Sequence, residues 1–374
     1  MEVRPCTAVL ARQRTASGGG RLFFPFPADR RASPPHDLQG KDLTRVALPV
    51  TIFAPESFLE RITSYWTFAP IFLQKAAAEK DAVERFKHVI AFAVAGLPFT
   101  TTQRKPFNST LGETHEAMFT DGSMLYLEQI CHHPPISQWQ MDGPKDAYKY
   151  YGQCLFHASF RGNVIKGQQK GPNVVEFPDG TKITWQLPAI KISGVMWGAR
   201  VVNFEGSIMF KDEKNNLACE LQFNPDAQGF LKSMFSRSKA PAADTVRGDV
   251  FSFDPAAKPN KKGKLEPTAV HCTAEGSWIS SLKFGDETVW DINVTETFKS
   301  VPVDDPLPSD SRFREDLIAL KEGDLDRAQE LKELIESTRR YEARLRSEAK
   351  KEEKKMAKKA PKTADVPAGK MLEA

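Results

Sequence analysis

Two adjacent histidines followed by two prolines are the most unusual chemical feature of the sequence. His132 and His133 directly precede Pro134 and Pro135. Because proline holds the residue before it in an extended conformation, His133 is not expected in a helix. Neighbouring residues of a strand point to opposite faces, so both rings can serve one ligand only where the strand ends, and the prolines predict that ending. Imidazoles donate hydrogen bonds and gain charge near a phosphate, which is the chemistry of an anion site.

Other interpretations of the histidine pair stay open at this point. Cys131 precedes the pair, but the helical i, i+4 spacing of a zinc site is missing and no clear third ligand is evident. A cysteine nucleophile next to its base on a strand would face away from it. Structural histidines, an anion site, and a metal or catalytic site therefore all remain. The enzymatic alternative is a metal-dependent hydrolase built on Cys131, His132 and His133.

A second stretch narrows these alternatives. It reads Lys-Pro-Phe-Asn-x-x-Leu-Gly-Glu at positions 105–113, and the histidines belong to Glu-Gln-x-x-His-His-Pro-Pro at 128–135. Together the two motifs resemble the signature of the oxysterol-binding-protein family of lipid-transfer proteins, in a short form that contains the lipid-binding domain alone. The resemblance runs from about Asp42 to Arg346.

A third element fits the same resemblance. In that family a C-terminal helix brings Lys, Glu and Arg at four-residue steps to the mouth of a lipid tunnel. Lys332, Glu336 and Arg340 have this spacing, which places them on one stripe of a helix. An exposed face held by ion pairs would show the same pattern. Together with the two motifs, we interpret the stripe as part of the site.

The resemblance implies a mainly β fold with flanking helices. It predicts a large antiparallel β-barrel enclosing a lipid tunnel, with a helical region before it and helices at the C-terminus. The head group of phosphatidylinositol 4-phosphate would lie at the entrance, where several cations can form charge-assisted hydrogen bonds to a phosphomonoester. The implied head-group contacts are Lys105, His132, His133, Lys332 and Arg340, with Asn108 and Glu336 as hydrogen-bonding or orienting partners.

The resemblance also implies a function. Family members exchange this phosphoinositide for a second lipid, commonly a sterol or phosphatidylserine, and one tunnel makes the two mutually exclusive. Trp66 is a candidate tunnel residue, although an aromatic residue on an apolar helix face is more often core. We expect intracellular lipid transfer by a monomer that touches anionic membranes transiently, with no enzymatic reaction, cofactor or metal. A lipid sensor that reports occupancy without net transport needs the same pocket and stays open.

Two positions depart from the family pattern. The family usually has proline after Asn108, whereas this chain has Ser109 and Thr110. Proline sets φ in advance, so its loss is expected to loosen the turn. Ile130 and Cys131 replace a Val-Ser or similar pair before the histidines. Neither change removes a polar group that the family is thought to use.

The elements that must hold these motifs are visible in the periodicity. Between Met118 and Phe298, short segments rich in β-formers alternate with turn signals such as Asp121-Gly122, which predicts a large antiparallel sheet. Before the motifs, apolar residues at helical spacing predict a helix from Glu56 to Trp66 and a second helix capped by Asp81. After Asp310 two more helices are expected, separated at 323–324.

Length and composition indicate how the chain divides into segments. The chain has 374 residues, 40% hydrophobic and 27% charged, which is the balance of a globular protein. We expect residues 1–40 to be disordered or to form a partial lid, 41–346 to form the lipid-binding domain, and 347–374 to form a disordered, lysine-rich tail. The net charge of +4 does not favour nucleic acid as a partner.

The sequence also predicts a location. The longest apolar stretch, 89–99, is shorter than the roughly 20 residues that cross a bilayer. No apolar run and cleavage site of a secretory signal appear in the first twenty positions. The five cysteines are widely spaced and form no CxxC pair, which fits free thiols in a reducing compartment. We therefore expect a cytosolic protein that associates peripherally with intracellular membranes.

Overall fold

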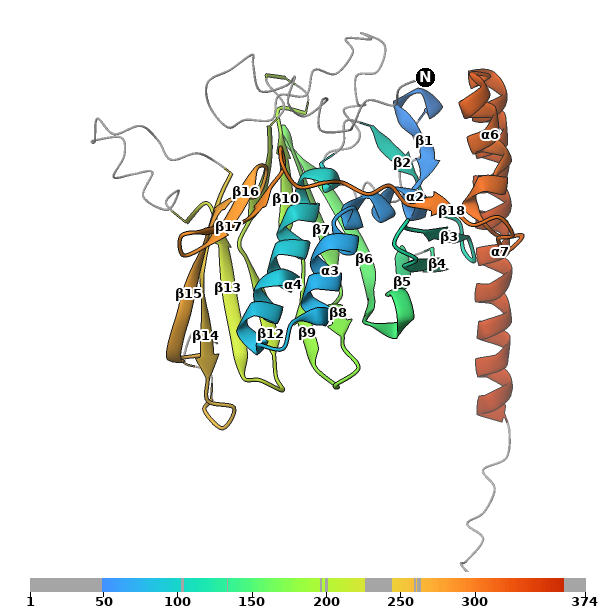
Figure 1. The fold of residues 1–374 in the computed structure, drawn as a ribbon. Coiled ribbons are helices and arrows are strands. Elements are labelled where there is room, and N and C mark those ends of the chain that lie inside the picture. Colours follow the sequence, from blue (N-terminus) through green and yellow to red (C-terminus); the bar gives the residue numbers. More distant parts are fainter. Residues whose placement is uncertain are drawn as a thin grey trace, which may run out of the picture.

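A strongly curved antiparallel sheet of 16 strands is the main feature of the computed structural model (Figure 1). The structure describes residues 49–359 apart from 102–103, 133, 196, 199–200, 226–243, 259 and 261–263, and it describes no side chains for 357–359. The sheet runs in the order β17-β16-β15-β14-β13-β12-β9-β8-β6-β5-β4-β3-β18, with β7, β10 and β11 branching from β6. Nearly all neighbours are consecutive in the chain, as expected for strands joined by short turns.

The strands of this sheet are short or of moderate length. They are β3 (Thr114–Met118), β4 (Met124–Cys131), β5 (Ile136–Asp142), β6 (Lys149–Arg161), β7 (Val164–Lys170), β8 (Asn173–Glu176), β9 (Lys182–Trp185), β10 (Ala189–Ser193), β11 (Val201–Glu205), β12 (Ser207–Asp212), β13 (Leu217–Phe223), β14 (Thr245–Phe253), β15 (Pro267–Ser277), β16 (Ser281–Phe284), β17 (Glu287–Asp291) and β18 (Val301–Pro302). A separate parallel pair consists of β1 (Phe53–Ser57) and β2 (Lys105–Phe107).

Two-residue periodicity explains how the sheet faces its core. In β4, Leu125 and Leu127 are buried, whereas Tyr126 and Glu128 between them are exposed. Successive side chains of a strand leave opposite faces, so one face of β4 packs inward and the other meets solvent. The predicted antiparallel sheet is confirmed.

Helices fill the concave side of the sheet. They are α2 (Phe58–Thr63), α3 (Ala69–Ala78) and α4 (Ala82–Gly96), with the short 3₁₀ segments η4 (Val50–Ile52), η5 (Ser64–Trp66), η6 (Leu97–Thr100) and, between β5 and β6, η7 (Pro144–Asp146). Figure 1 shows α3 and α4 lying against the inner face of the sheet. As predicted, Asp81 caps α4 by accepting hydrogen bonds from the amides of Val83 and Glu84.

Close packing at the end of α4 requires glycine. A Cβ atom on Gly96 would lie 2.3 Å from the carbonyl oxygen of Tyr65. This contact is well inside van der Waals distance, so any larger residue would push η5 away from α4. The aromatic residue next to that carbonyl, Trp66, would move with it. Gly96 therefore fixes the position of one wall of the interior cavity described below.

The sheet is not closed into a barrel, which corrects the predicted architecture. Its path ends at β17 on one side and β18 on the other. The segment between these strands crosses over the helices instead (orange in Figure 1). There Phe298 exchanges backbone and side-chain hydrogen bonds with Thr67, and Ser300 bonds Thr63. Because helical residues take these hydrogen bonds, the two edge strands do not meet.

The chain ends in η9 (Ser311–Phe313), α6 (Glu315–Glu322) and α7 (Leu325–Lys359). Gly323 ends α6 in the left-handed conformation, which confirms the predicted break between the two helices. Helix α7 continues well past Arg346, so the expectation of a disordered tail from 347 is wrong as far as Lys359. Its Ala, Glu, Lys and Arg content explains the difference, because these residues have high helix propensity. The remaining residues, 360–374, lie outside the described part, as does the proposed lid at 1–40.

Candidate functional site

The turn after β2 carries the first polar cluster. The ammonium group of Lys105 donates a hydrogen bond to Asn108 Oδ1 across 2.5 Å. Two positions later the backbone amide of Thr110 donates to Glu113 Oε2 at 2.8 Å. The Lys-Pro-Phe-Asn and Leu-Gly-Glu parts of the motif are therefore linked within one compact turn. Lys105 and Asn108, which the sequence placed in the same site, are in contact.

Ser109 is buried and hydrogen-bonded in this turn. Its hydroxyl lies 3.0 Å from the hydroxyl of Ser57, which caps α2 and donates to Glu113 Oε1. Because the Ser57 proton is used on Glu113, Ser109 is the donor to Ser57. A proline at this position could not make the hydrogen bond to Ser57. Hydrogen bonds thus restrain this turn where the family pattern has proline.

Arg314 connects the turn to the C-terminal helices. One guanidinium nitrogen donates to Glu113 Oε2 at 2.9 Å and to the carbonyl of Asn108 at 3.0 Å. The other two nitrogens bind the buried Asp316 at 2.8 and 3.1 Å. Burial alone would lower the pKa of Arg314, but the two carboxylates raise it. This arginine is a permanent cation that ties three segments together.

His132 reaches the same turn from the end of β4. Its Nδ1 lies 3.1 Å from the carbonyl oxygen of Ser109, so Nδ1 is the donor of this hydrogen bond. The ring is half-buried. His133 lies outside the described residues. The two sequence motifs therefore meet in space through His132 and Ser109.

A buried lysine of α7 completes the cluster. Only 4% of Lys332 is exposed, and its ammonium donates to Glu336 Oε1 at 2.6 Å. The ring of Phe53 lies between the two lysines, 5.5 Å from the Lys332 ammonium and 5.0 Å from that of Lys105. Burial and, to a smaller extent, the charge of Lys332 lower the pKa of Lys105 to about 8, and Glu336 opposes both. The ammonium groups of Lys105 and Lys332 thus both lie near the ring of Phe53 and near the carboxylate of Glu336.

Arg340 is the predicted residue that lies furthest from this cluster. It is exposed, and it makes no ion pair with any residue that the structure describes. It follows Lys332 by two turns, which is about 12 Å along the helix axis. The structure therefore gathers Lys105, Asn108, His132, Lys332 and Glu336 and leaves Arg340 at the rim.

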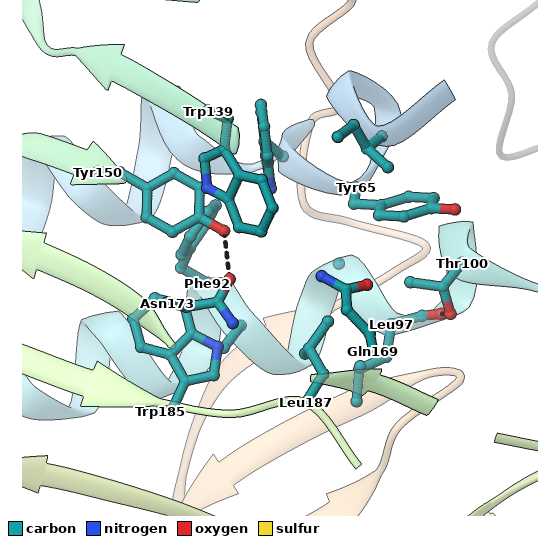
Figure 2. Close-up of a pocket in the computed structure, with 14 residues that line it drawn as sticks. Tyr65, Phe92, Leu97, Thr100, Trp139, Tyr150, Gln169, Asn173, Trp185 and Leu187 are labelled. Carbon is teal, nitrogen blue, oxygen red and sulfur yellow. Dashed lines mark hydrogen bonds between the residues drawn. The ribbon is translucent and has the colours of Figure 1, made fainter. Parts of the chain in front are cut away.

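The interior holds a narrow cavity next to these helices. Its volume is about 30 Å³, and aromatic and aliphatic side chains from η5, α4 and strands β5 to β9 surround it (Figure 2). Trp66, the candidate tunnel residue, lines it and packs on Trp139 and Tyr150 at 5.6 and 5.3 Å between ring centroids. A space of this size holds one or two water molecules, not a lipid. Side chains must move before a lipid can enter.

Two buried donors beside this cavity lack a well-formed hydrogen bond. The Tyr150 hydroxyl donates to Asn173 Oδ1 at 2.7 Å, as the dashed line in Figure 2 shows. Among the described residues, the amide nitrogen of Asn173 and the indole nitrogen of Trp139 make no hydrogen bond of good geometry, although the Trp139 nitrogen approaches the Tyr150 hydroxyl. Such groups cost free energy in an apolar interior. They suit a ligand that is mostly apolar and carries one oxygen acceptor.

A larger, open groove lies near the connection of α3 and α4, with a volume of about 660 Å³. Arg85 binds Asp179 at 2.5 Å and Gln74 binds Asp121 at 2.6 Å, while the other cationic side chain that lines it, Lys145, is exposed. The groove offers no uncompensated charge comparable to the two lysines at Phe53. We therefore place the candidate site at the lysine cluster and the aromatic cavity.

Sequence reasoning missed the residues that organise the cluster. Glu113 belongs to the first motif but was assigned no contact, and Arg314 was not singled out. The signal available was the spacing of Arg314 and Asp316 at i, i+2, which is not specific. Phe53 and Ser57 lie far from both motifs in sequence, and no local pattern indicates that they reach the site.

Two features of the described residues concern a metal site and a membrane-spanning helix. Among the described residues, no group of three or more His, Cys, Asp or Glu side chains is arranged to hold a metal ion, and His133 is not among those residues. No described helix is both long enough and apolar enough to span a membrane.

Comparisons with known proteins agree with the fold and the motifs. Residues 36–363 match the family described as oxysterol-binding protein. Oxysterol-binding protein 9 of Dictyostelium discoideum is 44% identical over 307 residues, which cover 81% of this chain and 71% of that protein. Human oxysterol-binding protein-related protein 1 is 25% identical, and the match covers 83% of this chain but 37% of that longer protein.

Solved structures show the same fold. The Osh1 ORD domain in complex with ergosterol superposes with a TM-score of 0.65 at 22% identity, covering 92% of this chain and 88% of that one. The Osh3 ORD of Saccharomyces cerevisiae in complex with PI(4)P gives a TM-score of 0.63 at 24% identity and covers 82% of each chain.

Proposed function

Because the chain belongs to the oxysterol-binding protein family, we propose that it transfers lipids between intracellular membranes. It binds one lipid at a time and exchanges phosphatidylinositol 4-phosphate for a second lipid. The protein is cytosolic and monomeric, and it touches anionic membranes transiently. The transfer requires no enzymatic step, metal or cofactor.

The observation that carries the head-group assignment is the pair of lysines at Phe53. Lys105 and Lys332 approach the same ring, and among the described residues Glu336 is the anion that acts on Lys105 there. The local charge is therefore positive in a partly desolvated place, where a phosphomonoester with nearly two negative charges is strongly favoured. Burial is the main cause of the lowered pKa of Lys105, and the charge of Lys332 adds to it.

The other predicted residues fit around that phosphate. His132 directs Nε2 away from the turn, because Nδ1 is held by Ser109. Asn108 and Glu336 hold the lysine ammonium groups in place and can turn to the inositol hydroxyls. His133 and Arg340 are the remaining proposed contacts, with Arg340 approaching from the rim. Charge-assisted hydrogen bonds of this kind are about twice as strong as neutral ones.

The interior favours a sterol as the second lipid. The cavity walls are rigid aromatic rings, including Trp66, Trp139 and Trp185, which match a flat fused-ring ligand. The poorly satisfied donors at Trp139 and Asn173 need one acceptor, and a sterol hydroxyl supplies one oxygen. Phosphatidylserine would bring a charged head group for which the described cavity residues offer no cation. One related domain, the Osh1 ORD, has been solved with ergosterol and with cholesterol.

The direct test is extraction of phosphatidylinositol 4-phosphate from liposomes. Wild type should remove the lipid from the vesicles, and the His132→Ala/His133→Ala variant should remove little. His271→Ala changes an exposed histidine of β15 and should extract like wild type. Equal extraction by the double variant would place the head group elsewhere.

Transfer between two vesicle populations separates transport from sensing. A transporter moves sterol in one direction faster when the acceptor vesicles hold the phosphoinositide. If the protein extracts both lipids but moves neither between vesicles, it is a sensor. If wild type extracts no phosphoinositide, the head-group assignment fails and a sterol-only carrier remains.

A further inference from the structure

The second half of α7 has no tertiary support from the described part of the protein. The helix packs through Ala328 and Leu331 on the core formed with β1 and α6. Every described side chain from Ala343 to Met356 is exposed. Figure 1 shows this end of α7 running away from β1. The head-group cluster, which consists of Lys105, Asn108, His132, Lys332 and Glu336, lies near the other end of the helix, where Lys332 approaches Phe53 of β1. Most helices in proteins owe their stability to packing, so this segment needs another explanation.

Its cations lie on one face of the helix. Lys350 and Lys354, like Lys351 and Lys355, are four residues apart, and Arg346 extends the first row. At 3.6 residues per turn these two rows occupy about half of the circumference. Glu352, Glu353 and the exposed Met356 fall on the other half. The sequence repeats the lysine spacing at 358 and 359, the last positions of the helix.

These lysines are not neutralised within the helix. The ion pairs of this region, Arg344 with Glu348 and Arg346 with Glu342, lie before them. None of the four lysines pairs with a carboxylate of the described chain. Like charges at i, i+4 destabilise a helix, so an anionic surface would relieve the repulsion.

We propose that this cationic face of α7, formed by Arg346, Lys350, Lys351, Lys354 and Lys355, docks on an anionic lipid bilayer. Lysines are flexible point charges, which suit the fluid array of head groups at a membrane surface. The face begins 14 positions after Lys332, or about 21 Å further along the same helix. Docking there leaves the head-group cluster accessible. The proposal goes beyond lipid exchange and does not depend on it.

Vesicle sedimentation tests the docking surface. The vesicles contain phosphatidylcholine with or without phosphatidylserine and hold neither phosphoinositide nor sterol. Wild type should bind the anionic vesicles, and salt should weaken the binding. Lys350→Gln/Lys351→Gln/Lys354→Gln/Lys355→Gln should bind at least about tenfold more weakly, because each lysine near such a surface contributes measurably.

Two controls separate this face from total charge. The first replaces four lysines that already have carboxylate partners, namely Lys166, Lys182, Lys211 and Lys214, with glutamine, and it should lose less than about twofold. The second, Lys350→Glu/Lys351→Glu/Glu352→Lys/Glu353→Lys, keeps the net charge and spreads the lysines around the helix. It should lose binding about as much as the glutamine variant.

Three results would overturn the proposal. Wild type could bind neutral and anionic vesicles equally, the redistributed variant could bind like wild type, or the protein could prefer single-stranded RNA to anionic vesicles at the same salt. Binding of a fluorescent sterol in solution is measured on each variant. It should not change, so a failure of the docking face is distinguishable from a failure of lipid binding.

Discussion

The head-group cluster and the interior cavity differ in how far their polar groups are satisfied. At the cluster, Glu113 has three partners and Arg314 binds Glu113, Asp316 and a carbonyl. In the cavity, two donors make no hydrogen bond of good geometry and the space is about 30 Å³. The cluster is therefore preorganised for its ligand, whereas the cavity must change before a lipid fits. Under the proposed function, the mouth recognises the head group, and the interior determines which second lipid can enter.

The largest effect is expected from a substitution that disrupts the hydrogen-bonded network around Glu113 and Arg314. Arg314→Gln would leave the carboxylates of Glu113 and Asp316 buried without their cation. We expect the free energy of unfolding to fall by about 3–5 kcal/mol, measured by urea denaturation. Arg247→Gln changes an exposed arginine of β14 and should cost less than about 0.5 kcal/mol. A loss below about 1 kcal/mol for Arg314→Gln would show that the network does not organise the mouth.

The second effect separates the two regions by ligand. Lys105→Met/Lys332→Met keeps the apolar stems against Phe53 and removes both charges. Phosphoinositide affinity should fall by about 100-fold, because charge-assisted hydrogen bonds contribute about 1.5–3 kcal/mol each. Sterol affinity should stay within about threefold.

Lys321→Met is the matched control for the lysine pair. It removes a lysine of α6 that lies near Glu60 rather than at Phe53. Binding of a soluble phosphoinositide and of a fluorescent sterol should be unchanged. Equal losses of both lipids in the double variant would contradict a separate head-group region.

The lowered pKa of Lys105 gives the mouth a pH dependence that the cavity lacks. The folded, lipid-free protein loses this proton near pH 8, below the ordinary value of 10.5. Between these values the unfolded chain binds more protons, so this group's contribution to stability rises with pH. Phosphoinositide binding needs the charged form, so affinity should fall by up to about tenfold per pH unit above pH 8.

Isothermal titration at several pH values checks this dependence. The phosphomonoester itself titrates near pH 6 and is fully charged over this range. Lys105→Met should bind weakly at every pH, with a flat profile. Sterol binding should not respond to pH. A flat profile for the wild-type phosphoinositide complex would show that Lys105 does not contact the phosphate.

The smallest expected effect concerns the interior cavity. Trp139→Phe removes a donor that makes no hydrogen bond of good geometry with the described residues, so relief of this group should offset much of the packing lost, and stability should fall by no more than about 1–2 kcal/mol. Sterol affinity should fall about three- to tenfold as one hydrogen bond is lost. Trp290→Phe removes another unpartnered indole donor that does not line the cavity, and it should leave sterol binding intact. Equal sterol affinities of wild type and Trp139→Phe would exclude this donor.

Local sequence patterns predicted the elements well because each depends on neighbouring residues. The cap at Asp81 and the break at Gly323 are local events, and alternation in β4 is visible within one strand. Closure of the sheet is not local. It depends on Thr67 meeting Phe298, far apart in sequence, and no periodicity reports that contact. The helical end of α7 was not predicted, because high charge is typical of disordered segments and obscures the high helix propensity of the same residues.

The residues of the candidate site likewise fall into two groups, those that local patterns predict and those that only the folded structure brings together. The two motifs and the spacing of Lys332 and Glu336 could be predicted because they are contiguous or one helical turn apart. Arg314, Phe53 and Ser57 could not, because their roles arise only when three distant segments fold together. Arg340 has the predicted spacing, yet exposure at the rim follows from where α7 leaves the body.

The central claim is that one site serves both lipids in turn. Protein loaded with one equivalent of a fluorescent sterol would be titrated with phosphatidylinositol 4-phosphate, and sterol release would be followed by fluorescence and by native mass spectrometry. The account predicts one sterol released for each phosphoinositide bound, and no release from Lys105→Met/Lys332→Met at the same concentrations. A complex that holds both lipids at once would contradict it.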